Sequence, residues 1–124
     1  MKTWLATLLF ALVAASPAPA AAQAGKFTLV NNTDVSFTNL MVRRYGSQQW
    51  LPLTVNPVPV TRSGGQGAVD FSDEECAFDL QATLPDGRVV VWSGVILCET
   101  KVVTLNRGAS GQLWVDYRLS LIHI

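Results

Sequence analysis

The sequence lacks most of the side chains and motifs on which enzymes depend. Its single histidine is His123, the penultimate residue, and its only cysteines are Cys76 and Cys98. It contains no G-x-S-x-G nucleophile turn, phosphate-binding loop, G-x-G-x-x-G fingerprint or H-E-x-x-H zinc motif. Because general-base catalysis most often uses a histidine, we expect no catalytic residue, no metal site and no cofactor.

The sequence also lacks an excess of either charge and a long apolar run. Its 9 Lys and Arg residues are balanced by 9 Asp and Glu residues. A nucleic-acid-binding surface needs clustered basic residues, so we expect no nucleic-acid partner. The apolar stretch Leu5–Ala15 is shorter than the ~20 residues that span a bilayer. We therefore expect no stable membrane insertion once this stretch has been cleaved off.

Residues 1–24 have the pattern of a secretory signal peptide. Lys2 gives a positive start, the uncharged stretch gives the apolar core, and Pro17 and Pro19 then break any helix. Ala22-Gln23-Ala24 fits the A-x-A pattern of signal peptidase sites. We predict cleavage after Ala24, with Ala22 as the second choice, and hence a periplasmic or secreted protein.

The other end of the chain has an unusual sequence. Residues 119–124, Leu-Ser-Leu-Ile-His-Ile, are the translation of CTG TCT CTT ATA CAC ATC, the end of a transposase-based sequencing adaptor. We expect this segment not to be native and exclude it, with His123, from the fold. The predicted organisation is a signal peptide over 1–24 and a single domain over 25–118.

Short strands separated by turn residues fill the predicted domain. Apolar and polar residues alternate from Cys76 to Leu84, the turn Pro85-Asp86-Gly87 follows, and Arg88–Trp92 returns as a second strand. A change of phase between Phe37 and Leu40 predicts a β-bulge near Asn39. No helical period is sustained anywhere. The pattern predicts an all-β fold, a small antiparallel β-sandwich that is immunoglobulin-like or a small barrel.

Cys76 and Cys98 are predicted to form one structural disulfide. Two cysteines in an exported chain pair most economically with each other. Pairing across the hairpin places Ile96 opposite Cys76, and two residues of slack around Ser93-Gly94 would bring Cys98 alongside. Redox pairs are usually closer in sequence, and structural zinc sites need four ligands. A redox or metal-binding role is therefore disfavoured.

Several short motifs resemble a group of small, uncharacterised periplasmic proteins of Gram-negative bacteria. The motifs are Phe27-x-x-Val30-Asn31-Asn32-Thr33, Cys76-x-x-Asp79-Leu80-x-Ala82, Asp86-Gly87, Trp92 and Cys98-Glu99. The likeness covers most of residues 27–105, and the proline-rich stretch after Trp50 departs from it. The resemblance implies an export signal and a small β-rich domain, and it implies no established activity.

The only acidic cluster is Asp73-Glu74-Glu75. It could serve carboxylate chemistry or bind Ca²⁺, but it lacks the D-x-D-x-D-G spacing of a calcium loop. We interpret it as a solvated turn before Cys76. Asp79 lies in mid-strand, where aspartate is disfavoured, and we expect it to make a structural hydrogen bond.

The aromatic residues suggest where a binding surface would lie. Tyr45, Trp50, Trp92, Trp114 and Tyr117 could form a sugar-stacking platform or a protein interface. A small domain needs large side chains to fill its core, so we assign Trp92 and Trp114 to the interior. Tyr45 and Trp50 mark the candidate binding loop.

These observations favour a non-enzymatic binding or structural protein of the periplasm, with a protein or envelope component as partner. Two alternatives stay open. One is an inhibitor-like module that presents the Tyr45–Val60 loop to an envelope enzyme, and the other is a small hydrolase using Asp73, Glu74 or Asp79. A hydrolase needs converging acids, one with a raised pKa, in a pocket. A binder should show an exposed apolar patch or an unpaired edge strand.

Overall fold

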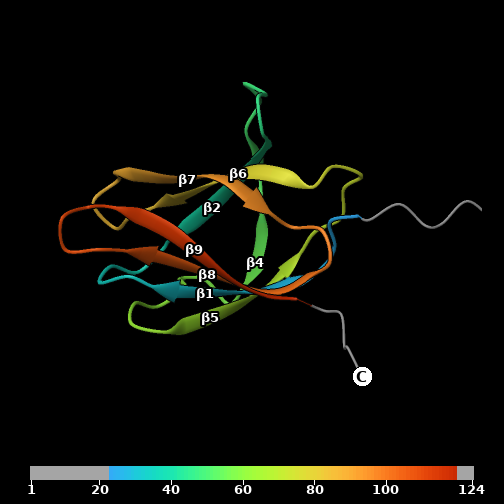
Figure 1. Ribbon diagram of the computed structural model, residues 1–124. Coiled ribbons are helices and arrows are strands. Elements are labelled where there is room, and N and C mark those ends of the chain that lie inside the picture. Colours follow the sequence, from blue (N-terminus) through green and yellow to red (C-terminus); the bar gives the residue numbers. More distant parts are fainter. Residues whose placement is uncertain (1–22, 120–124) are drawn as a thin grey trace, which may run out of the picture.

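A computed structural model describes residues 23–119 (Figure 1). The predicted leader up to residue 22 and residues 120–124 lie outside this range. The strands are β1 (Phe27–Asn32), β2 (Asn39–Arg44), β3 (Leu51–Pro52), β4 (Thr54–Asn56), β5 (Gly65–Asp70), β6 (Ala77–Thr83), β7 (Val89–Ile96), β8 (Thr100–Arg107) and β9 (Leu113–Leu119). The part of the chain that the structure describes contains no helix, and therefore none that could cross a membrane.

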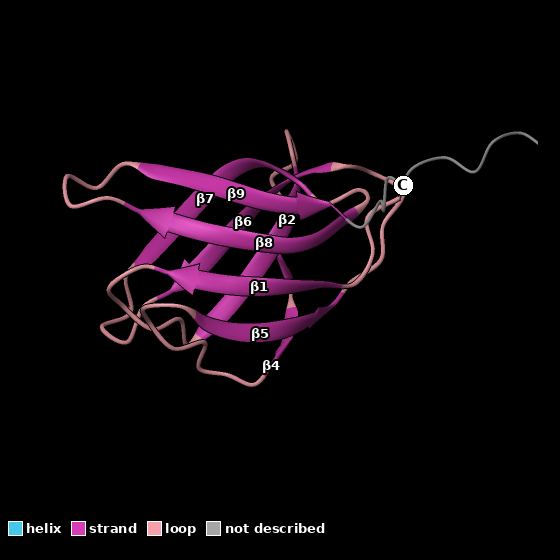
Figure 2. Cartoon of the chain, turned by 60° about the horizontal axis from the view of Figure 1, so that its bottom comes forward, coloured by secondary structure: helices cyan, strands magenta, loops and turns pink. Residues whose placement is uncertain are grey.

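The strands form two sheets that pack face to face (Figures 1 and 2). One sheet has the order β4-β5-β1-β8-β9, and the other has the order β3-β2-β6-β7. All pairings are antiparallel except that of β1 with β8, which is parallel. The predicted all-β fold is confirmed, as a sandwich that stays open at both sides.

Apolar side chains from both sheets fill the space between them. Trp92 of β7 is almost fully buried, as predicted, and its ring meets that of Phe37 edge to face at 5.6 Å between centroids. The Trp92 Nε1–H donates to the Asn106 carbonyl on β8 at 2.9 Å. This bond satisfies a buried polar group and ties one sheet to the other.

Next to its turn, the β6–β7 hairpin has the pairing that the sequence predicted. Thr83 faces Val89 and Leu80 faces Trp92, and the register then shifts by one residue opposite Ser93-Gly94. Gly94 has a φ of 67°, which glycine adopts at no steric cost. The bulge lies where it was predicted, but β7 has one extra residue there rather than the predicted two.

This bulge brings the two cysteines together. Cys76 and Cys98 form the predicted disulfide with their Cα atoms 4.9 Å apart. The Leu97 amide donates to the Cys76 carbonyl at 2.9 Å, so the backbone pairing continues up to the bond. The disulfide therefore closes the open end of the hairpin.

The prediction of a β-bulge near Asn39 was wrong. The strand β2 begins at Asn39, and Phe37 instead makes a separate antiparallel bridge to Val60. Asn31, whose side chain is fully buried, holds this crossing because its Nδ2 donates to the carbonyls of Val35 and Val60. The change of phase in the sequence marks the passage from one pairing to another.

Both ends of the described range pair with the domain. Ala24 is buried and exchanges two backbone hydrogen bonds with Asp73, at 3.0 and 3.1 Å. Leu119 lies opposite Thr100 at the end of β9. The folded unit therefore includes Ala24, which the favoured cleavage site would remove and the second choice would keep.

Candidate functional site

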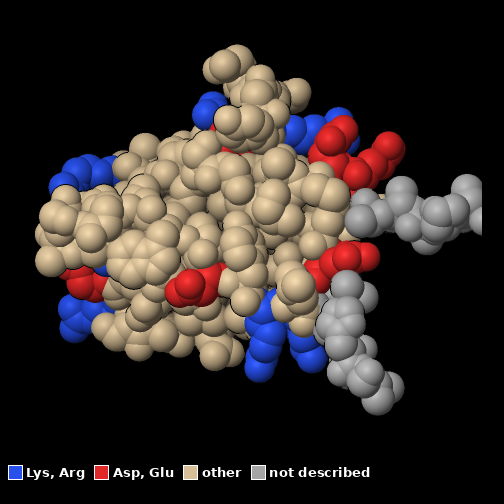
Figure 3. All heavy atoms as spheres, viewed as in Figure 1, with Lys and Arg blue, Asp and Glu red and all other residues tan. Residues whose placement is uncertain are grey.

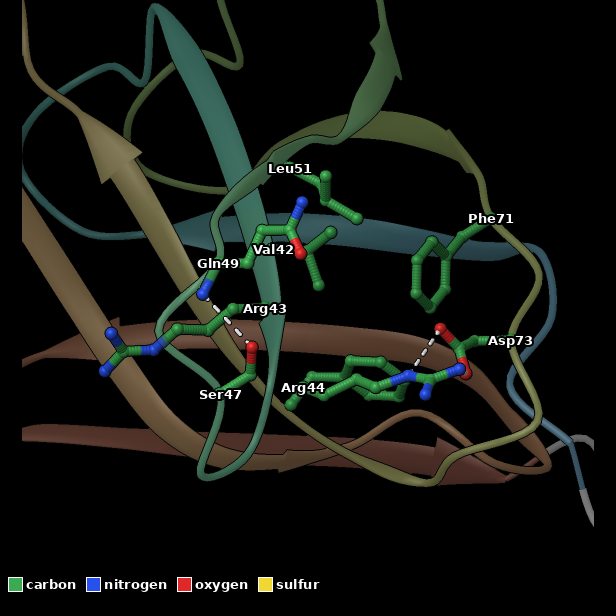
Figure 4. A pocket seen from close by; sticks show the side chains of 9 residues that line it. Val42, Arg43, Arg44, Ser47, Gln49, Leu51, Phe71 and Asp73 are labelled. Carbon is green, nitrogen blue, oxygen red and sulfur yellow. Dashed lines mark hydrogen bonds and ion pairs between the residues drawn. The ribbon is translucent and has the colours of Figure 1, made fainter.

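A pocket of about 300 Å³ opens beside the β2–β3 hairpin. Val42, Leu51, Phe71 and Phe78 make its apolar floor, and Arg44, Ser47, Gln49 and Asp73 contribute polar groups. Figure 4 shows Val42 and Leu51 facing Phe71 across the cavity, with Arg44 and Asp73 joined at its lower side. Phe71 follows β5 of one sheet while the other floor residues come from the second sheet, so the pocket lies at the opening between them.

The hairpin above the pocket projects beyond the sandwich (Figure 1). Its tip, residues 45–50, has the sequence Tyr-Gly-Ser-Gln-Gln-Trp and carries no charge. Tyr45 is 65% exposed at this tip. In Figure 3 the outermost part of the projection is tan, the colour of uncharged residues, and charged side chains lie at its base.

Short-range hydrogen bonds shape this tip. The Ser47 amide donates to the Arg44 carbonyl at 2.8 Å, and the Ser47 hydroxyl accepts from the Gln49 amide at 3.1 Å. The Tyr45 amide donates to the Ala77 carbonyl on β6 at 3.0 Å. The tip is thus a defined turn attached to the sheet.

Arg43 locks the base of the hairpin from the outer face of its sheet. Its Nε donates to Asp79 Oδ2 at 2.7 Å, and its guanidinium lies 4.4 Å from the centroid of the Trp50 ring. Figure 4 shows the Arg43 side chain pointing away from the pocket. A cation held over an indole ring is attractive, so Arg43 fixes Trp50 at the end of the tip.

Asp79 is the centre of this polar network. Its Oδ1 accepts from the Ser93 hydroxyl at 2.6 Å and from the Gly94 amide at 3.1 Å. Burial alone raises the pKa of the Asp79 carboxyl, but the hydrogen bonds from Ser93, Arg43 and Gly94 outweigh burial and hold that pKa below its usual value. The expected structural hydrogen bond is confirmed, and it stabilises the β7 bulge.

Asp73 has a similar environment at the pocket rim. It accepts two hydrogen bonds from the Arg44 guanidinium, at 2.9 and 3.3 Å, and one from the Glu75 amide at 2.9 Å. Burial raises its pKa, whereas Arg44 and the Glu75 amide lower it further, so the pKa lies below its usual value. The interpretation of the acidic cluster as a solvated turn fits the exposed Glu74 and Glu75, whereas the Asp73 side chain is only 18% exposed and closes the pocket.

The environments of Asp73 and Asp79 do not suit a proton-donating acid. A carboxyl that donates a proton at neutral pH needs a raised pKa, whereas both Asp73 and Asp79 have lowered ones. Asp73 lines the pocket and Asp79 does not. Residues 23–119 contain no group of three or more His, Cys, Asp or Glu side chains placed to hold a metal ion.

The burial of the aromatic residues differs in part from the prediction. Tyr45 and Trp50 lie on the projecting hairpin, and Leu51 links that hairpin to the pocket. The assignment of Trp114 to the core was wrong, because this residue of β9 is 45% exposed. Its strand lies at a sheet edge, and its side chain lies on the outer face opposite Asn106.

Sequence reasoning did not single out Arg43, Arg44 or Phe71. Two adjacent arginines at the end of an apolar strand were a usable signal, because the strand directs them to opposite faces. One pairs with Asp79 outside the sheet and the other with Asp73 at the pocket. The position of Phe71 depends on how the two sheets pack, and no local pattern indicates that.

Comparison with known proteins gives no family for this chain. No family model and no curated protein matches it. The chain is similar to a protein from Eubacterium rectale whose structure was determined by NMR, at 17% identity and a TM-score of 0.47. The match covers 81% of this chain and 93% of that one. A likeness at this level carries no argument about function.

Proposed function

We propose that this protein is an exported, non-enzymatic binding module that recognises a protein of the cell envelope through its β2–β3 hairpin. The observation that carries the proposal is the projecting, uncharged tip, which exposes Tyr45 and lies beside an apolar pocket. Tyr, Ser, Gly and Trp are the residues that binding loops favour, because rigid rings give contact area at a low entropic cost. An apolar side chain of the partner would fill the pocket.

The hydrogen bonds at the base of the tip support this role. Binding costs less free energy when the binding loop already has its bound shape. Arg43 is held between Asp79 and Trp50, and Arg44 is held by Asp73, so the base of the hairpin is fixed before a partner arrives. The convex shape of the tip also favours the inhibitor-like alternative, in which the hairpin enters the cleft of an envelope enzyme.

Export is part of the proposal. The disulfide is compatible with an oxidising compartment, and the resemblance to periplasmic proteins points the same way. We further propose that the leader is cleaved after Ala22, since Ala24 packs into the domain. Mass spectrometry of the exported protein should then find Gln23 at its N-terminus, whereas an N-terminus at Gly25 would contradict this cleavage site.

Site-specific photo-crosslinking tests the binding role. A photoreactive phenylalanine would replace Tyr45 at the tip or, as the matched control, Val89, an exposed residue at the start of β7. In cells that naturally express the protein, we expect a discrete adduct from position 45 and none from position 89. Equal adducts from both positions, or none from position 45, would contradict the proposal. An adduct with an enzyme whose activity the added protein blocks would establish the inhibitor-like form.

A further inference from the structure

The strand β9 is a long edge strand that, like the edge strand β7, contains no proline. Edge strands present unpaired backbone groups, and proteins commonly shorten them or interrupt them with proline. The edge strand β3 has two residues and includes Pro52, and β4 has three residues and runs into Pro57 and Pro59. By contrast, β9 has seven residues and no proline.

The side chains of β9 are unusually apolar for an exposed edge. Leu113, Trp114 and Tyr117 are exposed large hydrophobic residues, with Trp114 on the outer face and Leu113 and Tyr117 on the opposite face. The Tyr117 hydroxyl accepts from the Ile96 amide of β7 at 3.0 Å. Exposed apolar side chains on a strand without a neighbour favour association with another surface. These side chains lie on the side of the sandwich where β7 and β9 are the edge strands, whereas the projecting hairpin is formed by β2 and β3.

The backbone of β9 presents a regular set of groups for pairing. The Gly108 amide donates to the Gln112 carbonyl, which fixes the pattern of the β8–β9 ladder. Because bonded and unbonded pairs alternate in an antiparallel ladder, Trp114 and Asp116 bond towards β8. The N–H and C=O groups of Leu113, Val115 and Tyr117 therefore point away from β8, towards whatever lies beyond the edge.

The two charges of β9 favour one register over the two next to it for pairing with another β9. A second copy can pair antiparallel only in registers that join these outward-pointing residues with one another. With Tyr117 opposite Tyr117 of the second copy, Asp116 faces Arg118 of the second copy, and Arg118 faces its Asp116. Moving one register in either direction sets Asp116 against Asp116, or Arg118 against Arg118. Opposite charges across paired strands are favourable, and like charges are unfavourable.

We propose that two copies of this chain associate through β9, joining their five-stranded sheets into one continuous sheet with its two-fold axis at Tyr117. Asp116 is exposed and uses its Oδ2 to accept from Asn106, while Arg118 has no ion pair within residues 23–119. Both charges are thus available to the second copy. The central contacts use residues 116–118, which precede the adaptor-like segment.

Charge exchange tests this interface on the chain as it is expressed and secreted. Analytical ultracentrifugation over a range of concentrations should show a monomer–dimer equilibrium. Arg118→Asp places carboxylates opposite each other at two symmetric positions, and we expect the dimer to weaken by roughly tenfold or more. The double variant Asp116→Arg/Arg118→Asp exchanges the two charges and should restore dimerisation. A wild-type chain that stays monomeric, or a dimer that Arg118→Asp leaves unchanged, would overturn the proposal.

Cysteine substitution tests the register separately and does not depend on the double variant folding. In the proposed dimer the two Tyr117 residues face each other across the two-fold axis, at about the 5.5 Å between Cα atoms that a disulfide accepts. Tyr117→Cys should therefore give a covalent dimer under oxidation. Val115→Cys is the matched control, because the register separates the two copies of Val115 by four residues. Crosslinking that is equal at both positions, or stronger at 115, would refute the register.

Discussion

The sheet edges on the two sides of the sandwich differ in strand length, proline content and exposed side chains. On the side of β3 and β4 the strands are short and interrupted by proline, and side chains near the hairpin form ion pairs. On the side of β7 and β9 the strands are long, and the exposed residues are largely apolar. The difference indicates two kinds of surface: a shaped hairpin for a different protein, and a pairing edge for a second copy.

Two separate sets of interactions stabilise the four-stranded sheet. The buried carboxylate of Asp79 on β6 is matched by three donors, one from β2 beside the hairpin and two from the β7 bulge, so its burial is compensated. Within its sheet β7 pairs only with β6, and the disulfide closes the end of that pair. The Asp79 network therefore links β2, β6 and β7, whereas the disulfide acts at the end of β6 and β7, and each can be removed separately.

Removal of the disulfide should have the largest effect. Replacing Cys76 and Cys98 with serine frees a loop of about 21 residues, which by loop entropy lowers the free energy of unfolding by about 3 kcal/mol. For a domain of this size, that loss lowers the Tm by on the order of 10 to 20 °C. In hydrogen exchange, the amides of β7 should lose protection before those of β2. Equal loss in both strands would contradict the assignment of the disulfide to one side.

Breaking the network at Asp79 should come next. The side chain of Asp79 is only 4% exposed, and Asp79→Ala leaves Arg43, Ser93 and Gly94 without their acceptor. We expect a loss of about 2 to 3 kcal/mol in a chemical denaturation experiment. The matched control is Asp116→Ala on β9, an exposed carboxylate, which should cost less than about 1 kcal/mol. Similar losses in the two variants would remove the contrast between the sides.

The pH dependence of stability sharpens the same contrast. The pKa of Asp79 is below its ordinary value of 3.8 in the folded state, so its stabilising contribution is complete above that value and is lost as the pH falls below it. Wild-type stability should therefore decline on acidification. The Asp79→Asn variant should have a lower free energy of unfolding at neutral pH and should lose less of it as the pH falls. Parallel curves for the two proteins would show that Asp79 does not contribute in this way.

The smallest change in stability should follow substitution of Trp114. Because this side chain is exposed on the outer face of β9, Trp114→Ser should change the free energy of unfolding by less than about 1 kcal/mol. It should also leave photo-crosslinking from position 45 unchanged, since the two residues lie on different sides. A loss comparable to that of a core substitution would mean that Trp114 packs more tightly than its exposure indicates.

Local patterns in the sequence predicted the β6–β7 hairpin well. The alternation up to Leu84 and the turn at Pro85-Asp86-Gly87 set the pairing, and Gly94 indicated where the bulge would lie. Proximity across this hairpin then made the disulfide predictable. All of these features depend on residues close in sequence, for which period and turn chemistry are sufficient information.

Features that depend on distant pairing could not be predicted. The parallel partnership of β1 with β8 and the pocket between Val42 and Phe71 arise from packing of separate segments. Trp114 was misassigned because a large aromatic residue has the same sequence signature at a sheet edge and in a core. Only the strand order shows that β9 has no neighbour beyond it in its sheet.

NMR at increasing protein concentration tests most directly whether the two sides bind different partners. If β9 is the self-association edge and the hairpin is reserved for a different protein, concentration should shift the amide signals of residues 113–119. The signals of residues 45–50 should stay in place over the same range. Shifts centred on the hairpin, or none at β9, would contradict this account.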